Sequence, residues 1–252
     1  MMKTTLLKNM WRPLAYTSMA MMALLSASGE ATLTPINAPG GSEPNLVVNS
    51  AQQSVLNHLY GAGNYVRVDD SLDQIWNSTN GTTQVVARFA GNNQTLGYYK
   101  GSSGLTDGTT FNTLYNVGGS GYGVTGASAG LTEPNFRWGL KTVGSQGTQY
   151  LSSKPSDNVL DDAAYKDHMV TFKITGTSGG HSGNVIGNYI LAFEDLLYNH
   201  YKGYTSDRDF QDAVFEFKKI GVPEPSTYLI LGTTLFAAMV LLWRRKQAKA
   251  RI

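Results

Sequence analysis

The chain has 252 residues, of which 15% are charged and 28 are glycine, and it contains no cysteine. The absence of cysteine excludes disulfide frameworks, cysteine-based zinc sites, iron–sulfur clusters and thiol nucleophiles. The low charge and an apolar fraction of 41% exclude a highly charged disordered chain and a coiled coil. The composition therefore favours a globular protein with glycine-rich connections.

The net charge of +2 hides an uneven distribution along the chain. Residues 32–222 hold 16 acidic and 12 basic residues, a net charge of −4, and the other basic residues lie at the two ends. A nucleic-acid binder concentrates positive charge on its folded part. We therefore do not expect nucleic acid to be a partner.

The N-terminal end has the pattern of a secretory signal peptide. Lys3, Lys8 and Arg12 precede a mostly apolar run over residues 14–26, and small residues follow it. The run is shorter than the about 20 residues that a membrane span needs, which favours a cleaved signal over an N-terminal anchor. We expect residues 1–31 to hold the signal peptide and the start of a leader, with the secretion machinery as a partner.

The C-terminal end combines a Pro-Glu-Pro motif, an apolar stretch and a basic cluster, in this order: Pro223, Glu224 and Pro225; residues 228–243; Arg244, Arg245 and Lys246. Basic residues stay on the cytoplasmic side, so a single apolar helix here would hold the preceding chain outside the cytoplasm. Residues 222–252 resemble the PEP-CTERM sorting signal of exosortase-processed bacterial proteins. The resemblance implies transient anchoring in the inner membrane, removal of the tail by an exosortase-type membrane protease, and a final place at the cell surface or outside the cell. The alternative is an ordinary tail anchor.

The body of the chain has a strand-like pattern. After a flexible leader over 32–50 and a short helix over 52–60, short segments rich in β-branched and aromatic residues alternate with Gly, Asn, Ser and Asp clusters, at 65–68, 83–89, 95–99, 136–140, 169–174, 189–193 and 213–217. This spacing predicts an all-β domain over residues 51–221, a jelly-roll-like β-sandwich with long glycine-rich loops. The longest of these loops is expected at 101–135.

Five carboxylates flank one connection near the end of this domain, the segment 196–206: Glu194, Asp195, Asp207, Asp209 and Asp212. If the strands on either side pair as a hairpin, both ends of the connection bring acids to one rim. Carboxylates that lie so close repel unless they are protonated or bridged by a cation. Calcium accepts irregular sets of oxygen ligands, whereas zinc prefers histidine and cysteine. The alternatives are solvated loop residues, or turn caps at Asp209 and Asp212.

The same residues resemble a family of bacterial exported domains known as domain of unknown function 4114. The resemblance rests on Phe193-Glu194-Asp195 and on Asp207-Arg208-Asp209-Phe210-Gln211-Asp212, where Gln211 replaces the usual asparagine. The segment 86–97 is similar to an earlier strand pair of that family. The resemblance strengthens the expectation of calcium and implies no particular activity.

Three other features have a chemical interpretation. Asp69, Asp70 and Asp73 form a second acidic cluster, for which a surface turn is the expected structure. Segment 126–130 matches the Gly-x-Ser-x-Gly nucleophile elbow in letters only, although His168, His181 or His200 with Asp161 or Asp162 could complete a triad on paper. Glu194 with Asp209 or Asp212 could form the carboxylate pair of a glycosidase.

The sequence as a whole predicts a non-enzymatic, exosortase-sorted protein of the bacterial envelope or extracellular matrix, with Ca²⁺ as its cofactor. Exopolysaccharide, and with it a role in biofilm, is a further expected partner. The alternative function is a carbohydrate-binding, lectin-like module or a glycosidase that acts on the exopolysaccharide.

Overall fold

A computed structural model gives the structure of the chain, which divides into two compact units, Met1–Leu33 and Thr34–Ile252. The structure describes residues 33–40, 42–47, 54–102, 104, 106–123, 128–178 and 184–218. The predicted signal peptide at 1–31 and the sorting signal at 222–252 lie outside these residues. No helix among the described residues is long and apolar enough to cross a membrane.

Strands are the main regular secondary structure in the described part of the second unit. Its elements in chain order are α2 (Val55–Tyr60), β1 (Tyr65–Arg67), β2 (Trp76–Arg88), β3 (Asn93–Lys100), β4 (Phe111–Val117), β5 (Gly121–Tyr122), β6 (Ser128–Gly144), β7 (Gly147–Ser152), the 3-10 helices η1 (Pro155–Asp157) and η2 (Ala163–Tyr165), β8 (Met169–Ile174), β9 (Tyr189–Phe193), the 3-10 helix η3 (His200–Lys202) and β10 (Ala213–Lys218).

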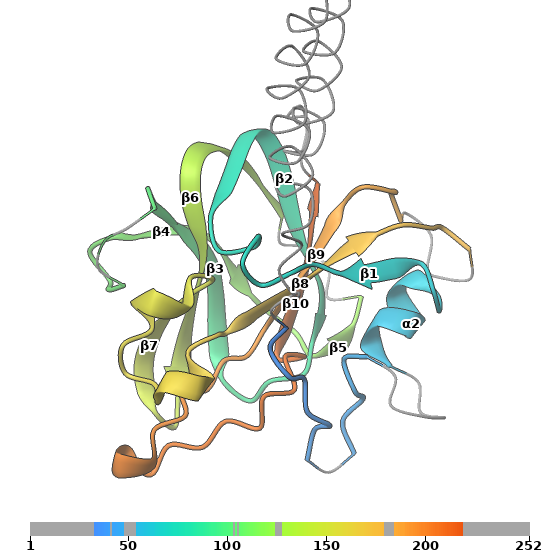
Figure 1. Cartoon of the computed structure of the whole chain (residues 1–252). Coiled ribbons are helices and arrows are strands. Elements are labelled where there is room, and N and C mark those ends of the chain that lie inside the picture. The colour runs from blue at the N-terminus through green and yellow to red at the C-terminus, as the bar shows by residue number, and fades with distance from the viewer. Residues whose placement is uncertain are drawn as a thin grey trace, which may run out of the picture. The chain divides into compact units, whose positions relative to one another are not determined.

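The strands form one antiparallel sheet with the order β1-β8-β9-β10-β2-β6-β3-β4, and β5 and β7 pair with β2 and β6 (Figure 1). The long strand β6 joins the two parts of this sheet, because its first half pairs with β2 and its second half with β3 and β7. Pro134 and Asn135, whose φ is +50°, lie where the pairing with β2 changes register. Such an irregularity bends a strand and increases its twist.

The bend brings strands that are distant in the sheet order face to face across the main core. The ring of Trp138 in β6 contacts Phe217 in β10 with 5.0 Å between centroids, and Tyr115 in β4 lies 6.4 Å from Phe215 in β10. Both faces of β8, β9 and β10 are covered, since alternate residues belong to this core and to a second one that includes α2. Burying one such large apolar side chain contributes about 1.5–3 kcal/mol.

The all-β prediction is confirmed, and the packing across the main core is consistent with a β-sandwich, although the strands belong to one bent sheet. The predicted helix corresponds to α2, and all seven predicted segments contain strand. The prediction of one long loop over 101–135 is wrong, because β4, β5 and the start of β6 lie there. Glycine-rich flanks hide these strands from a pattern search.

Residues 34–47, which the sequence assigns to a flexible leader, contact the domain through their described part. Leu46 is fully buried in the second core. The backbone N–H of Asn37 donates to the carbonyl of Arg208 at 2.9 Å, and its side-chain amide donates to the carbonyl of Asp207 at 2.8 Å. The segment therefore lies against the second half of the acidic motif.

Candidate functional site

The acidic motif lies where three neighbouring strands start or end. Phe193, the last residue of β9, pairs with Met169 at the start of β8 and with Ala213 at the start of β10. The expected hairpin pairing of the last two strands is therefore present. Glu194 follows directly after β9 and so lies between the residues that precede the other two strands, His168 and Asp212.

The structure brings all five predicted carboxylates together in two groups that share Glu194. One group is Glu194, Asp207 and Asp209, the other is Glu194, Asp195 and Asp212, and one oxygen from each member lies within 4.8 Å of the others in its group. Glu194, Asp195 and Asp209 are buried. The alternative in which the motif is a set of solvated loop residues is therefore wrong for these three, while Asp207 is exposed.

Side-chain amides from the β2–β3 connection and the start of β3 hold Asp195. Gln94 donates to its Oδ2 at 2.6 Å and Asn92 donates to its Oδ1 at 3.1 Å. Arg88 fixes both donors, since its Nε donates to Gln94 Oε1 at 3.0 Å and its guanidinium also donates to the carbonyl of Asn92. These three residues were not predicted as part of the site, although the segment 86–97 was singled out for its resemblance.

Asp209 is held by its own turn and, through Gln211, by the N-terminal segment. The backbone N–H of Gln211 donates to Asp209 Oδ1 at 3.3 Å, while its side-chain amide donates at 2.9 Å both to Asp209 Oδ2 and to Glu43. The residues on either side of Asp209, Arg208 and Phe210, have φ values of +59° and +57°. Bulky residues adopt this left-handed conformation at a cost in energy, and such strain is concentrated at functional sites.

Asp212 accepts a hydrogen bond across the strand ends, from the backbone N–H of Asp195 at 2.8 Å. The capping roles that the sequence left open are thus present at Asp209 and Asp212. They do not account for Glu194, whose Oε1 accepts from the N–H of Leu196 at 3.2 Å and whose Oε2 has no hydrogen-bond partner among the described residues. Glu194 is only 1% exposed, so bulk solvent does not reach this oxygen.

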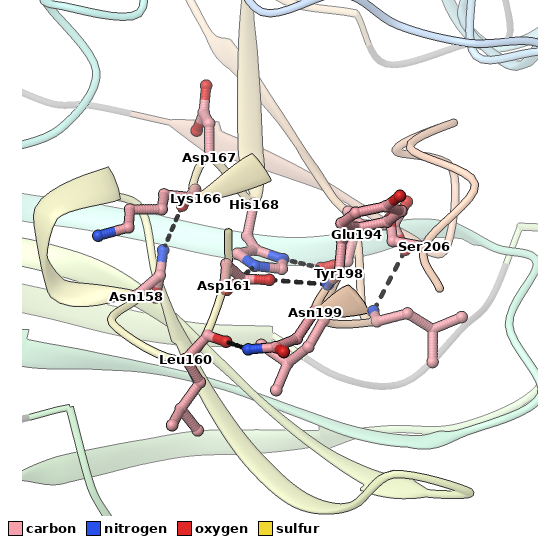
Figure 2. Close-up of polar contacts among 12 residues, drawn as sticks. Asn158, Leu160, Asp161, Lys166, Asp167, His168, Glu194, Tyr198, Asn199 and Ser206 are labelled. Atoms are coloured by element: carbon pink, nitrogen blue, oxygen red, sulfur yellow. Dashed lines mark hydrogen bonds and ion pairs between the residues drawn. The ribbon is translucent and has the colours of Figure 1, made fainter. Parts of the chain in front are cut away.

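A buried histidine–aspartate pair fixes the backbone of Glu194 from the other side (Figure 2). His168 lies within hydrogen-bond distance of the Glu194 carbonyl through Nδ1, at 3.2 Å, and of Asp161 through Nε2, at 2.9 Å. Asp161 in turn accepts from the backbone N–H of Tyr198 at 2.8 Å. Because both partners of the ring are acceptors, a doubly protonated imidazolium satisfies them both. The pair thus ties Glu194 to the connection that separates the two halves of the motif.

Three buried carboxyl groups of the motif hold their protons more tightly than usual. Burial, and then the charges of Asp207 and Asp209, raise the pKa of Glu194 to about 8. Burial also raises the pKa of Asp209 to about 6, against the opposing hydrogen bond from Gln211. Burial and the charges of Glu194 and Asp195 raise the pKa of Asp212 well above its ordinary value. The cluster therefore favours a bound proton or a bound cation over free negative charge.

The pKa of His168, beside the cluster, is also raised, which favours the positively charged form of this side chain. Burial alone lowers the pKa of His168, but the hydrogen bond and charge of Asp161 outweigh burial and raise it. The resulting positive charge lowers the pKa of Glu194, so it offsets part of the repulsion among the carboxylates.

The second acidic cluster is not the surface turn that the sequence predicts. Asp69 does cap a turn, but Asp70 and Asp73 are buried. Asp70 forms an ion pair with Arg67 at 2.6 Å. Burial, followed by the charge of Asp167, raises the pKa of Asp73 to about 9. Whether residues of the β1–β2 connection are buried depends on tertiary packing, which the spacing of acidic residues in the sequence does not reveal.

Ser128, the serine of the Gly-x-Ser-x-Gly match, does not lie on a strand-to-helix turn. Ser128 is the exposed first residue of strand β6. His168 and Asp161 do pair, yet the ring of His168 is 1% exposed and its other nitrogen faces the backbone of Glu194. This pair therefore belongs to the acidic site and does not support a catalytic triad with Ser128.

Comparison with known proteins identifies one segment. The profile of the PEP-CTERM protein-sorting motif matches residues 221–246. The motif implies export, transient anchoring in a membrane, processing by an exosortase and a final location at the surface or outside the cell. Among curated proteins and solved structures, none matches the chain. The resemblance of the body to domain of unknown function 4114 stays a prediction.

Proposed function

We propose that this chain is a non-enzymatic, exosortase-sorted protein of the bacterial envelope or extracellular matrix, whose β-domain is stabilised by calcium at the acidic motif. One observation carries the proposal: Glu194 lies among four aspartates, is 1% exposed, and has an Oε2 without a hydrogen-bond partner among the described residues. A buried carboxylate oxygen without a donor costs about 1–3 kcal/mol or more. A cation removes that cost.

The donor set favours calcium over other metals. Every predicted ligand is a carboxylate, and hard oxygen donors suit calcium and magnesium rather than zinc. The two groups take their oxygens from the end of β9, from the residue before β10 and from the turn between them. Calcium tolerates irregular sets of six to eight oxygens, whereas magnesium demands a near-ideal octahedron.

The alternative, a glycosidase or a lectin-like module at this motif, requires carboxylates that a sugar can reach. Glu194 and Asp209 are each 1% exposed, so a saccharide cannot approach them in this conformation. The raised pKa of Glu194 suits a general acid, but burial also produces it. A stabilising ion site explains the same observations without access for a substrate.

Exopolysaccharide remains part of the proposal as a partner of the whole protein at the cell surface. The sorting motif supports this setting, since it directs the protein out of the cytoplasm. Co-sedimentation of the purified protein with exopolysaccharide of the host tests the association. Protein that stays in the supernatant at every polysaccharide concentration would contradict it.

Calcium binding is tested by thermal unfolding of the full chain in a mild detergent, in calcium and in a chelator. Binding to the native state alone adds about 2.7 kcal/mol when free calcium is 100 times its Kd, which raises Tm by about 5–10 °C for a domain of this size. Asp209→Asn should reduce this shift, because asparagine can keep a hydrogen bond from Gln211 but offers less charge to a cation.

The matched control is Asp162→Asn. Asp162 lies on the neighbouring connection and pairs with the exposed His200, outside both carboxylate groups, so its replacement should leave the calcium shift intact. A wild-type Tm that is equal in calcium and in chelator would overturn the proposed function.

A further inference from the structure

The carboxylates of the acidic motif form two ligand sets rather than one. Glu194, Asp207 and Asp209 make the first set, and Glu194, Asp195 and Asp212 make the second. Calcium binds oxygen at about 2.3–2.6 Å, so ligands of one ion lie within about 5 Å of one another. Each set meets this condition on its own, with its oxygens within 4.8 Å.

Glu194 is the residue that can serve both sets. It is the shared member, and a carboxylate has two oxygens that can bind different ions. Its Oε1 accepts one long hydrogen bond, 3.2 Å from the N–H of Leu196, and its Oε2 accepts none among the described residues. Because Glu194 is 1% exposed, the free oxygen lies in the protein interior, where a bound cation would satisfy it.

The two sets differ in how firmly the fold holds them. In the second set Asp195 is fixed by Gln94 and Asn92, and Asp212 by the backbone N–H of Asp195. In the first set Asp207 is exposed, and no hydrogen bond to its carboxylate occurs among the described residues. Every aspartate of the second set is therefore held by hydrogen bonds, whereas in the first set Asp209 is held and Asp207 is not.

We infer that the acidic motif is a two-cation centre in which Glu194 bridges two calcium ions, one on each set. The inference rests on the proposed function and adds to it the number of ions and their division among the ligands. The preorganised second set binds the first ion more tightly, since less ordering accompanies binding. The first set binds the other ion more weakly, because the exposed side chain of Asp207 has to be ordered on binding.

The test is the number of calcium ions bound per chain, measured by equilibrium dialysis of the full, metal-depleted protein in a mild detergent. The wild type should bind two ions, in two steps of unequal affinity. Asp207→Asn should remove the weaker step and leave one ion, and Asp195→Asn should remove the tighter step. Glu194→Gln should weaken both steps at least tenfold, while the control Asp162→Asn should still bind two ions.

The outcomes separate the two claims. Two ions in the wild type, divided as described, support the bridged centre. One ion, lost equally in the variants of either set, overturns the bridged centre and leaves the calcium function standing. No ion in the wild type overturns both. Because the wild-type stoichiometry decides the question, a variant that fails to fold, as seen by circular dichroism, does not obscure the result.

Discussion

Without calcium, the protein should lose stability as the pH rises, because the fold keeps the buried carboxyl of Glu194 protonated. Burial and the charges of Asp207 and Asp209 raise its pKa from 4.5 to about 8. The native state therefore binds this proton more tightly than the unfolded chain does. The resulting stability is fully present below the ordinary pKa, declines as the pH rises through the raised pKa, and is absent above it.

The size of the effect follows from the same two values. The interval from 4.5 to about 8 corresponds to at most about 5 kcal/mol of unfolding free energy. That is a large part of the about 5–15 kcal/mol by which a typical domain is stable. Calcium competes with this proton for the Glu194 carboxylate, so a rise in pH favours calcium binding. Stabilisation by calcium should therefore grow as the pH rises across this interval.

Two buried carboxyls provide a matched comparison. Glu194→Gln should flatten the pH dependence of the chelated protein and abolish most of the calcium response. Asp73, whose pKa is raised to about 9, lies outside both carboxylate groups. Asp73→Asn should also reduce the pH dependence, over an interval that extends to about pH 9, but should leave the calcium response unchanged.

Urea unfolding at a series of pH values, in calcium and in chelator, measures these free energies. The buried Trp76 and Trp138 make tryptophan fluorescence a suitable signal. The reasoning fails if the chelated wild type has the same unfolding free energy at about pH 5 and about pH 8. It also fails if Glu194→Gln keeps the pH slope of the wild type.

Three further predictions concern positions elsewhere in the chain. His168→Gln should lower the free energy of urea unfolding by about 3 kcal/mol, because it breaks a buried ion pair. His200→Gln, at the exposed pair with Asp162, should change it little. Equal effects of the two substitutions would contradict the role assigned to His168. Gly97→Ala should lower stability by about 1–3 kcal/mol, since a Cβ there would meet the ring of Phe111, while Gly91→Ala, with open space around it, should be neutral by thermal scan. Intact-mass measurement of protein from an exosortase-containing host should show loss of residues 228–252, and a retained tail on most molecules would count against processing.

The strands that the sequence predicted are those with an unbroken local pattern. The segments 169–174, 189–193 and 213–217 correspond to β8, β9 and β10, whose two faces are both buried. The strands it missed, such as β4, are framed by glycine, and β7 is short and polar at its start. Their pairing with β3 and β6 supplies the order that their own sequence does not indicate.

The acidic site was predictable as far as it depends on one hairpin. Five carboxylates on either side of a single connection come together whenever the flanking strands pair, and β9 and β10 do pair. The supporting residues were not predictable. Gln94 reaches Asp195 across 101 positions in sequence, and His168 reaches Glu194 across 26. Those contacts depend on which strands become neighbours, which the sequence pattern does not fix.

The place of β10 in the sheet also determines how the protein bears a mechanical load. This strand lies between β9 and β2 and ends at Lys218, just before the matched sorting motif at 221–246. A pull applied to the C-terminal end of β10 along the strand axis loads the pairing with both neighbours. The hydrogen bonds to both neighbouring strands run across that axis, so they share the load in shear and have to break together. An edge strand pulled away sideways would lose its hydrogen bonds one by one. The strand that precedes the sorting motif is therefore one that two neighbours hold against a pull along its axis.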